Sequence, residues 1–344
     1  MPNKQYTSNN SLTILNGPEI NHAAWNTLLQ KSSFASPFQS PDYYKSIERF
    51  RHYQAIVYAL NINGQLGALV FIVFMKEPGP ESVFSKRGVI FGGPLLADDI
   101  SSEELIFFLK KVAEKFKGKA IYLETRNFFD FSSYKNEFEQ AGWNYEPYLN
   151  FQLDLEGLNN ENLLAKFKYN RRREIKQSVT SGAAYGLCIH DEEVKDVYEI
   201  LSNLYKTRVK LPLPPLGYFL GLYEHNLIKV FVVKHNDKVI GGSFCPFLPG
   251  KAIYTYYYCG LRDYHKRIFP THLAVLAAME YAIDNKIPVL DFMGAGKPDM
   301  DYGVRKYKSE FGGTQVEHGR FIKILNPFMY NLGKLGLRIL AKIG

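Results

Sequence analysis

Residues 55–74 read AIVYALNINGQLGALVFIVF, two apolar runs on either side of Asn63-Gly64. Asn-Gly between runs of β-branched and aromatic residues predicts two strands, at 55–60 and 68–74, joined by a tight hairpin. Further along the chain we predict a strand at 88–91, a break at Gly92-Gly93-Pro94, a helix near 102–116 and a strand at 120–124. Hairpin, strand, helix and strand, in this order, predict a mixed sheet with helices packed on it.

The same order of elements recurs in the second half of the chain. Predicted strands at 229–234 and 239–244 flank a turn at Asn236-Asp237, and a strand at 252–259, a helix near 270–284 and a strand at 289–292 follow. Each half also opens with helical segments, at 21–31 and 41–50 in the first and at 161–181 and 192–207 in the second. We therefore predict a first domain at 1–156, a second at 157–326 and a C-terminal helix at 327–344.

The composition of the 344-residue chain fits a globular protein with a basic surface. A formal net charge of +8 favours anionic partners such as phosphates, nucleic acid or acidic lipid headgroups, although so dilute a charge also fits a protein without them. The three cysteines, Cys188, Cys245 and Cys259, form no metal-ligand spacing and fit a reducing compartment. No apolar run reaches the ~20 residues of a membrane helix, and the polar N-terminus lacks a signal-peptide core. We expect a cytoplasmic protein without a metal site.

A strongly basic segment, LLAKFKYNRRREIK, occupies residues 163–176 of the helix predicted at 161–181. At about 100° per residue, the apolar side chains Leu164, Phe167, Ile175 and Val179 share one face, and Arg171 falls in the middle of it. An inward-facing guanidinium needs a partner, and a phosphate or carboxylate can bind it with two hydrogen bonds. We predict that Arg171 holds a phosphate of the donor or acceptor. An internal salt bridge and a solvated basic face are the alternatives.

A glycine-rich loop follows the predicted strand at 289–292, in the segment LDFMGAGKPD, residues 290–299. Sites in open α/β sheets gather beyond the carboxyl ends of strands, and glycines let a ligand approach the backbone closely. We therefore predict that Gly294 and Gly296 contact a ligand, although a tight turn would explain them equally well. Asp291 could orient an amine or accept its proton, or could be purely structural.

Residues 302–313, YGVRKYKSEFGG, predict a helix that ends at Gly312-Gly313. Lys308 lies on the apolar side of this helix, and Arg305 lies at the edge of that side. A lysine on an inner face can stabilise an oxyanion or a phosphate. The alternative is a lysine stem packed over the core with its ammonium group in water. The predicted apolar stripe consists of Val304, Tyr307 and Phe311.

The predicted strand at 252–259 contains the run YTYYY at 254–258. Strand alternation would place Tyr254, Tyr256 and Tyr258 on one face and Tyr257 on the other. A hydroxyl here, with Tyr256 as our candidate, could act as a general acid or bind the leaving group, although core packing is the commoner role of a strand tyrosine. Among the scattered histidines, His265 is the one expected at a site edge.

These segments, in this order, resemble the FemAB-like branch of the GNAT acyltransferase superfamily, the peptidoglycan-bridge or non-ribosomal peptidyl transferases. The resemblance implies an α/β (α+β) fold of two GNAT-like halves, each a mixed, mostly antiparallel sheet flanked by helices, with the acceptor site in the cleft between them. The matching segments run along nearly the whole chain. They are PFQSP at 37–41, GGPL at 92–95, AGW at 141–143, RRREIK at 171–176, DFMG at 291–294, YGV at 302–304 and KSEFGG at 308–313.

The resemblance also implies a reaction and some of its residues. It implies transfer of an acyl or aminoacyl group, from acyl-CoA or aminoacyl-tRNA and without a metal, to an amine of an anionic acceptor related to the cell envelope, which could be lipid-linked. The family's lysine before a Phe-Gly pair corresponds to Lys308, and its phosphate-binding arginine corresponds to Arg171 or Arg172. Arg305, beside Lys308, is a further phosphate-binding candidate.

The sequence departs from the family pattern in two places that concern the donor. No coiled-coil arm for contacting tRNA is visible, and residues 262–269 stand where an acetyl-CoA transferase has its pyrophosphate loop. The donor therefore stays open between a CoA thioester and aminoacyl-tRNA. The alternative function is a GNAT-fold module that has lost catalysis and binds a phosphorylated ligand or RNA.

The C-terminal segment, residues 327–344, predicts a basic amphipathic helix that begins at Pro327. Lys334, Arg338 and Lys342 recur every four residues and therefore share one face. Such a helix can lie on an anionic membrane, which would place the protein at the inner face of the membrane. The alternative is that the helix packs on the second half of the chain with its cationic groups in water.

Overall fold

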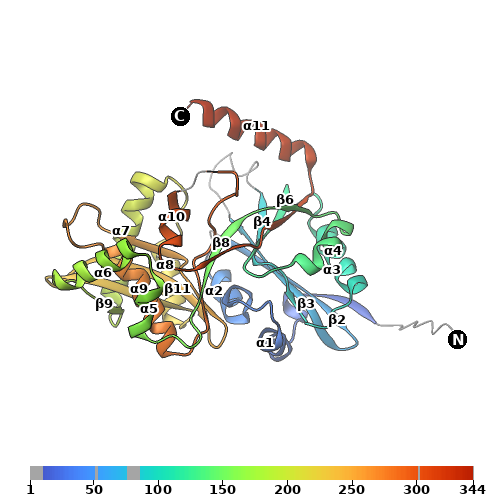
Figure 1. Ribbon diagram of the computed structural model, residues 1–344. Helices are drawn as coiled ribbons and strands as arrows, with labels where there is room; N and C mark the ends of the chain where they lie inside the picture. The colour runs from blue at the N-terminus through green and yellow to red at the C-terminus, as the bar shows by residue number, and fades with distance from the viewer. Residues whose placement is uncertain (1–10, 51–52, 76–85, 301–302, 344) are drawn as a thin grey trace. The chain divides into compact units, whose positions relative to one another are not determined.

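The computed structural model describes residues 11–50, 53–75, 86–300 and 303–343, with side chains up to residue 336 in the last helix. The chain forms two compact units, coloured along the chain in Figure 1. Unit 1 comprises Met1–Glu146 and Arg320–Gly344, and unit 2 comprises Pro147–Gly319. The prediction of a cytoplasmic location rested in part on the polar N-terminal residues, and these lie outside the described part of the chain.

The division differs from the predicted boundaries because a strand near each boundary pairs in the sheet of the other unit. A strand within the predicted first domain lies in unit 2, and a strand within the predicted second domain lies in unit 1. Strand β8 (Leu149–Asp154) lies between β14 and β15 in the sheet of unit 2, so unit 2 begins before residue 157. Strand β16 (Arg320–Ile324) pairs with β6 and β7 in unit 1, so the chain returns to unit 1 before residue 327.

The sheet of unit 1 has the order β1-β2-β3-β4-β6-β16-β7, with β5 beside β3. The predicted hairpin is present, with Asn63 and Gly64 at φ +51° and +90°, the left-handed values that a two-residue turn matching the strand twist requires. Strands β4 and β6 are parallel and the other pairs are antiparallel. The remaining bounds are β1 (Leu12–Asn16), β2 (Tyr53–Ile62), β3 (Gln65–Met75), β4 (Arg87–Gly92), β5 (Leu95–Leu96), β6 (Tyr122–Asn127) and β7 (Asn144–Glu146).

Helices cover both faces of this sheet, because alternate residues of its central strands are apolar on both sides. Helix α3 (Ser102–Phe116) spans the predicted residues and begins with a capping box between Ser101 and Glu104. Its apolar face packs in a core with Val70 and Ile72, whereas Phe71 between them meets rings of α2. The other helices of unit 1 are α1 (His22–Lys31), α2 (Pro41–Glu48), α4 (Lys135–Gln140) and α11 (Pro327–Ile343).

The sheet of unit 2 repeats this plan, with the order β15-β8-β14-β12-β11-β10-β9 and β13 beside β11. The turn between β10 and β11 places Asn236 and Asp237 at φ +50° and +58°. Strand β12 is parallel to β14, as β4 is to β6. The strands are β9 (Ala184–Leu187), β10 (Ile228–His235), β11 (Lys238–Leu248), β12 (Ala252–Tyr254), β13 (Tyr257–Gly260), β14 (Val289–Asp291) and β15 (Thr314–Glu317).

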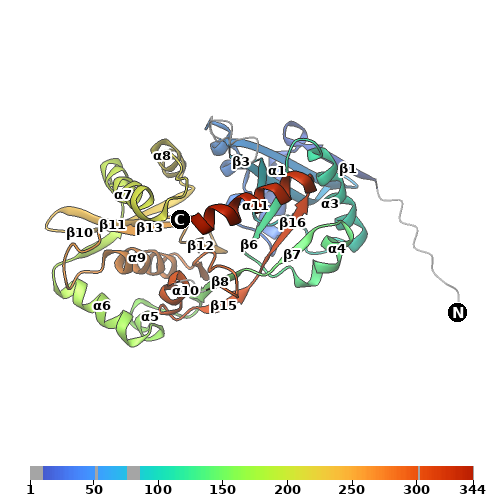
Figure 2. The same ribbon diagram turned by 90° about the horizontal axis from the view of Figure 1, so that it is seen from above.

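The helices of unit 2 lie on both faces of its sheet, with α6 and α9 on one face and α7 and α8 on the other (Figure 2). Helix α9 (Pro270–Asp284) spans the predicted residues, and most of its side chains are buried in the core. No helix among the described residues is long and apolar enough to cross a membrane. The other helices are α5 (Asn160–Lys166), α6 (Tyr169–Thr180), α7 (Asp191–Leu204), α8 (Leu216–Glu224) and α10 (Gly303–Ser309), and a π-helical turn, η5 (Tyr205–Val209), extends α7.

The prediction of one continuous helix at 161–181 is wrong, because the chain breaks between α5 and α6. Phe167 and Lys168 have extended backbones, with ψ of 150° and 152°. The Phe167 ring is buried in the core, and the Lys168 N–H donates to the Glu310 carbonyl oxygen at 2.9 Å. A tertiary hydrogen bond and a buried ring thus replace one turn of helix.

One strand of each unit is interrupted at the equivalent place. In unit 1, β4 and β5 both pair with β3 and are separated by Gly93-Pro94, within the predicted break at Gly92-Gly93-Pro94. In unit 2, β12 and β13 both pair with β11 and are separated at Thr255-Tyr256. The predicted single strand at 252–259 is therefore two strands. The interruption in unit 2 opens onto the candidate site.

Candidate active site

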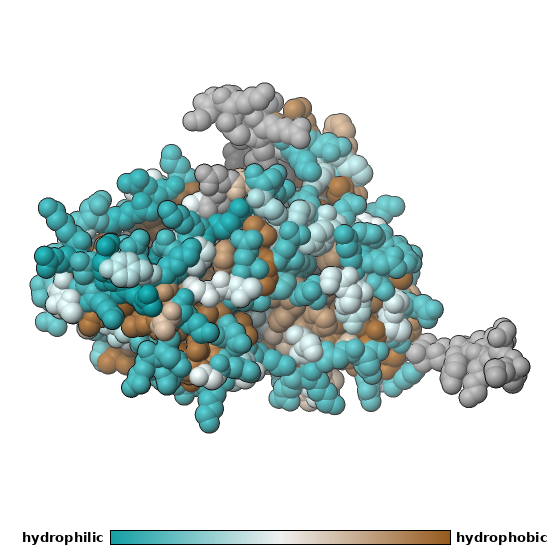
Figure 3. Space-filling view, viewed as in Figure 1, coloured by the Kyte–Doolittle hydropathy of each residue, from teal (hydrophilic) through white to brown (hydrophobic). Residues whose placement is uncertain are grey.

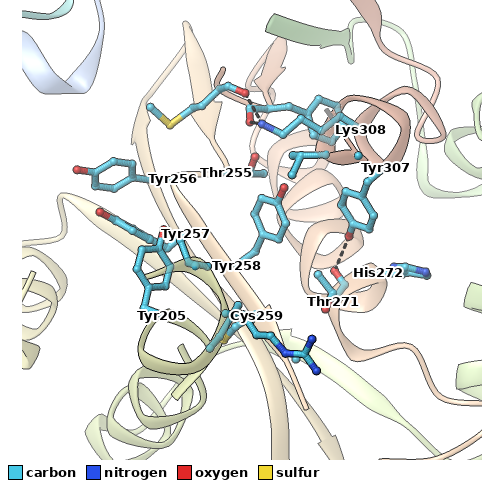
Figure 4. Close-up of a pocket in the computed structure, with 18 of the residues that line it drawn as sticks. Tyr205, Thr255, Tyr256, Tyr257, Tyr258, Cys259, Thr271, His272, Tyr307 and Lys308 are labelled. Carbon is cyan, nitrogen blue, oxygen red and sulfur yellow. Dashed lines mark hydrogen bonds between the residues drawn. The ribbon is translucent and has the colours of Figure 1, made fainter. Parts of the chain in front are cut away.

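A cavity of about 690 Å³ opens in unit 2 at the interruption between β12 and β13 (Figure 4). Its cations are Arg208, Arg262 and Lys308, and the lining residues that the structure describes include no Asp or Glu. Aromatic walls with a few polar groups are typical of ligand sites, and this charge pattern favours a neutral or anionic ligand. The tyrosines of the wall are Tyr205, Tyr256, Tyr257, Tyr258 and Tyr307.

The interruption turns three consecutive tyrosines toward the same cavity, so the predicted alternation of faces is wrong. The Thr255 N–H donates to the Asp291 carbonyl oxygen at 2.9 Å, which fixes the break. Tyr254, before the break, is buried with 1% of its surface exposed. After the break, the ring centroids of Tyr256 and Tyr257 lie 4.3 Å apart. The Tyr258 ring stacks on that of Tyr307 of α10, with centroids 5.8 Å apart (Figure 4). The candidate Tyr256 thus lies in the cavity wall.

Lys308 lies at the cavity with its ammonium group bound by the loop after β14. Its Nζ donates to the carbonyl oxygens of Phe292 at 2.6 Å and Gly294 at 2.8 Å, and also to that of Met293 (Figure 4). Burial lowers the pKa of Lys308 from 10.5 to about 8, although the nearby carboxylate of Asp291 opposes this. The structure therefore places a buried positive charge beside the cavity, as the apolar stripe of the predicted helix indicated.

Asp291 ends β14 and organises the same loop. Its carboxylate accepts hydrogen bonds from Asn150 at 2.8 and 2.9 Å, from Gln152 at 2.9 Å and from the Met293 N–H at 2.6 Å. Burial raises the pKa of this carboxyl group, and the hydrogen bonds oppose the rise. Met293 has φ +54°, a left-handed conformation that this bond helps to hold. Asp291 is not among the described lining residues, so the structure places it behind the loop that Lys308 binds.

The two predicted glycines have different environments. Gly294 lines the cavity, and a Cβ atom added there would meet nothing within 4 Å. Gly296 has φ +80°, and its carbonyl oxygen accepts from the Leu149 N–H at 2.9 Å, so it forms a turn that only glycine adopts easily. Of the two, Gly294 has open space for a ligand.

The guanidinium of Arg305 binds the loop itself. Its Nε donates to the Ala295 carbonyl oxygen at 3.2 Å and its Nη1 to that of Pro298 at 3.3 Å, and the Lys297 carbonyl oxygen accepts a third bond. Arg305 and Lys308, three residues apart on α10, therefore hold successive parts of one loop. A phosphate contact of Arg305 stays a prediction.

Arg171 lies in an internal ion pair, which the sequence analysis gave as the alternative to a phosphate contact. Its side chain is 2% exposed, and its Nη2 lies 2.7 Å from Oε2 of Glu310. The guanidinium lies between the rings of Tyr307 and Phe311, with its central carbon 4.5 and 4.6 Å from their centroids. Protein groups thus occupy the position predicted for a ligand, and Arg171 ties α6 to the helix that carries Lys308.

Part of this chain matches a known protein family by sequence, and nearly all of it matches solved structures by fold. Residues 230–336, which include β12, β13 and Lys308, match the sequence model of the FemAB family. The crystal structure of FemX superimposes with a TM-score of 0.71 at 15% identity, covering 92% of this chain and 99% of that chain. Residues 230–336 are therefore FemAB-like, and the chain as a whole shares the fold of FemX. No curated protein matches the chain by sequence.

Two further solved structures share the fold of this chain. The C-terminal domain (DUF2156) of a putative lysylphosphatidylglycerol synthetase from Agrobacterium fabrum has a TM-score of 0.59 at 12% identity, covering 93% of this chain and 96% of that chain. A tandem GNAT protein from the clavulanic acid biosynthesis pathway has a TM-score of 0.56 at 11% identity, covering 92% and 99%. Together with the family match, these findings support an acyl- or aminoacyltransferase built from two GNAT-like halves.

His272 lines the cavity, although the sequence analysis expected His265 at the edge of the site. It lies at the start of α9, stacked on Phe269 with centroids 5.3 Å apart. Its Nε2 lies 3.2 Å from Oε2 of Glu174 on α6. Burial, and then repulsion by Arg171, lower the pKa of His272 from 6.5 to about 3. The imidazole is therefore neutral and donates its Nε2–H to Glu174.

The π-helical turn η5 is the other part of the site that sequence patterns missed. Tyr205, Arg208 and Val209 line the cavity from this turn, and Lys210 ends it at φ +55°. A π-helical turn shifts side chains away from the 3.6-residue period, so periodicity could not indicate which of them face inward. Among the described residues, no group of three or more His, Cys, Asp or Glu side chains is placed to hold a metal ion.

Proposed function

We propose that this FemAB-like chain transfers an aminoacyl group from aminoacyl-tRNA to an amine of an anionic, lipid-linked cell-envelope precursor. The choice of an RNA ester over a CoA thioester rests on one observation, the start of helix α9. In the GNAT fold this helix start is the site for the donor's pyrophosphate, because free N–H groups and the helix dipole attract phosphate.

Most of the backbone N–H groups around the start of α9 already have acceptors within the protein. Phe269 donates to Ser178 Oγ at 2.9 Å, Ile268 to the His265 carbonyl oxygen at 3.3 Å, and His272 to the Phe269 carbonyl oxygen at 3.0 Å. Pro270, the first residue of the helix, has no N–H group. Few donors remain for a pyrophosphate, which disfavours CoA.

The cavity has the chemistry that aminoacyl transfer needs. Its tyrosine rings can stack on a terminal base, and Arg208 and Arg262 can bind phosphate. The acceptor amine attacks the ester carbonyl carbon, and negative charge develops on the carbonyl oxygen. The carbon–oxygen bond to the ribose then breaks, and the ribose oxygen leaves as a hydroxyl group with the proton that the amine nitrogen loses. Lys308 supplies a nearby positive charge in a buried environment, where it stabilises this oxyanion most effectively.

The other predicted residues take supporting parts in this reaction. Tyr256, in the cavity wall, is our candidate to hydrogen-bond the ribose oxygen as it leaves. Asp291 and Arg305 hold the loop whose carbonyl groups bind Lys308. The anionic acceptor agrees with the cations of the cavity, and one structural relative is named for joining lysine to phosphatidylglycerol.

Competing donors test this proposal directly. Purified full-length protein is incubated with a cell-envelope lipid extract and either a charged tRNA pool or a set of acyl-CoA thioesters, and mass spectrometry detects modified lipids. We expect aminoacyl products from charged tRNA alone. Products from acyl-CoA would refute the choice of donor. Tight binding of an envelope lipid without turnover of any donor would favour the alternative, a binding module that has lost catalysis.

A further inference from the structure

We infer that the outer face of helix α6 binds the phosphate backbone of RNA and so holds the donor tRNA at unit 2. The inference rests on the proposed function, because it names the surface that the donor would use. Helix α6 lies in the same unit as the cavity, and its Glu174 contacts His272 of the cavity wall. An RNA strand bound along α6 would therefore pass close to the reacting end.

The charges of α6 are sorted between its two faces. The inner face carries Arg171 and Glu174, which are engaged with Glu310 and His272. On the outer face, Arg172, Arg173 and Lys176 have no carboxylate partner within ion-pair distance among the residues described. Three positive charges thus remain without a partner on one side of a helix of twelve residues.

These cations line an open groove of about 500 Å³, which is formed by side chains of α6 alone. The groove extends along residues 169–180, about three helical turns, and Figure 3 shows this face as strongly hydrophilic. Tyr169, at its N-terminal end, has 69% of its surface exposed and offers a ring on which an unpaired base can stack. The full lining is Tyr169, Arg172, Arg173, Lys176, Gln177 and Thr180.

The pattern of the face favours RNA over a membrane surface. A helix that lies on a membrane directs an apolar strip outward, between its cations. Of the two aliphatic side chains of α6, Ile175 is buried in the core and Val179, predicted to face inward, is 46% exposed. One exposed valine does not form an apolar strip, and the groove contains amide and hydroxyl groups instead. Cations interleaved with hydrogen-bonding groups and an exposed ring are typical of surfaces that follow a nucleic-acid backbone.

Salt-dependent binding of uncharged tRNA tests the inference. The full-length chain is compared with a triple variant, Arg172→Gln, Arg173→Gln and Lys176→Gln. The control is a triple variant with the same loss of charge at exposed lysines of unit 1, Lys110→Gln, Lys115→Gln and Lys119→Gln. We expect the α6 variant to bind at least ten-fold more weakly, with the slope of log affinity against log salt reduced by about 2 to 3, and the control to stay within two-fold.

Each outcome of this experiment bears on the inference separately from the proposed function. Equal losses in the two variants would show a non-specific charge effect and overturn it. Normal tRNA affinity of the α6 variant, combined with lost affinity for vesicles containing phosphatidylglycerol, would assign the face to a membrane and also overturn it. If RNA binding is lost in the α6 variant but the wild type uses acyl-CoA, the surface stands and the donor assignment falls. Matched thermal unfolding of both variants confirms that they are folded.

Discussion

The interrupted strands of the two units have the same place in the fold but different surroundings. In unit 1 the interruption is filled: Gln39 Nε2 donates to the Gly93 carbonyl oxygen at 2.8 Å, and a Cβ atom on Gly93 would lie 2.8 Å from the Phe131 ring. Phe38 stacks on Phe91 at the end of β4. In unit 2 the interruption is lined by tyrosines and opens onto the cavity.

The parallel strand next to each interruption carries a buried carboxylate with different partners. Glu124 of β6 forms ion pairs with Arg126 at 3.0 Å and Arg320 at 2.6 Å, and these arginines lower its pKa although burial opposes them. Asp291 of β14 is held by amide donors, and burial raises its pKa. The order of elements therefore fixes the fold of both units, whereas the side chains at the interruption decide which unit has a site.

The largest effect that we expect comes from removing the buried cation of unit 2. Arg171→Met leaves Glu310 without its ion-pair partner, whereas Glu174 keeps its contact with His272, and breaking a buried ion pair costs about 3–5 kcal/mol. Arg320→Met in unit 1, whose side chain is 20% exposed, is expected to cost less. Both tryptophans, Trp25 and Trp143, lie in unit 1, so urea unfolding followed by tryptophan fluorescence reports on unit 1, and circular dichroism reports on both units.

The control for this experiment is the neighbouring exposed residue. Arg173→Met is expected to change stability by less than about 0.5 kcal/mol. If Arg171→Met lowers the urea midpoint followed by tryptophan fluorescence, unit 1 is destabilised. If the part of the circular dichroism signal that belongs to unit 2 keeps its midpoint, the ion pair does not stabilise unit 2, and the assignment is contradicted.

Lys308 gives the next effect, on activity. Lys308→Met is expected to lower the rate of transfer from aminoacyl-tRNA about 100-fold, because it removes a preorganised charge next to the reacting carbonyl. The matched control is Lys323→Met in unit 1, whose Nζ also donates to a carbonyl group, that of Ala141 at 2.8 Å. Equal rate losses in the two variants would show that neither lysine acts through the site.

The pH dependence of the rate sharpens the role of Lys308. Its pKa of about 8 means that the ammonium form is lost as pH rises through that value. We therefore expect the rate at saturating donor to fall above about pH 8 in the wild type. A rate that keeps rising to pH 10 would mean that the charge of Lys308 is not required.

Glycine substitutions test whether one interruption is filled and the other open. Gly93→Ala must fit a Cβ atom 2.8 Å from the Phe131 ring at φ +82°, and should lower the stability of unit 1 by about 1–3 kcal/mol. Gly294→Ala meets nothing within 4 Å and should leave stability within about 0.5 kcal/mol while it narrows the cavity. Equal thermal unfolding of the two variants would remove the distinction between the units.

Acid should weaken unit 2 through His272. The pKa is about 3 in the folded protein and near 6.5 in the unfolded chain, so only the unfolded chain takes up this proton as pH falls below 6.5. The contribution of His272 to the free energy of unfolding is therefore fully present above about pH 6.5, and it falls by up to about 1.4 kcal/mol for each pH unit between pH 6.5 and about 3. Urea unfolding at several pH values measures this slope. His272→Gln should flatten it, and an unchanged slope in that variant would assign the acid sensitivity elsewhere.

The smallest effect on stability concerns helix α11 of unit 1. It exposes Phe328 and Leu335, with 75% and 54% of their surfaces accessible, and its Tyr330 packs on Tyr122 of β6. Membrane contact through this helix stays a prediction. In flotation with phosphatidylglycerol vesicles, the full-length chain is expected to float and a chain ending at Asn326 to stay in the soluble fraction. If both remain soluble and the shorter chain unfolds at lower temperature, the helix serves the fold alone.

The fold was largely predictable because its signals are local. Asn63-Gly64 specifies a hairpin by its own backbone preferences, and the predicted helices at 102–116 and 270–284 begin and end where α3 and α9 do. The breaks at Phe167 and Thr255 were missed because tertiary partners fix them, the Glu310 and Asp291 carbonyl groups. No local pattern indicates a hydrogen bond to a residue far along the chain.

The site was predictable only in part, for the same reason. Helical periodicity placed Lys308 and Arg171 on inner faces, as the structure has them. Periodicity gives a direction but no partner, so it could not tell a ligand phosphate from Glu310, 139 residues away. His272 gave no signal, since a single histidine near the start of an apolar helix resembles an ordinary core residue.

The ion pair between Arg171 and Glu310 has a consequence for how this sequence can vary. Arg171 and Arg172 are chemically identical neighbours, yet one is fixed by a partner and the other faces solvent. Among relatives, positions 171 and 310 should change together, because either charge alone in the core is costly. Position 172 should exchange Arg with Lys freely, since only a positive charge is needed at the surface. If positions 171 and 310 covary among relatives while position 172 varies independently, the two faces of this helix are under different structural constraints.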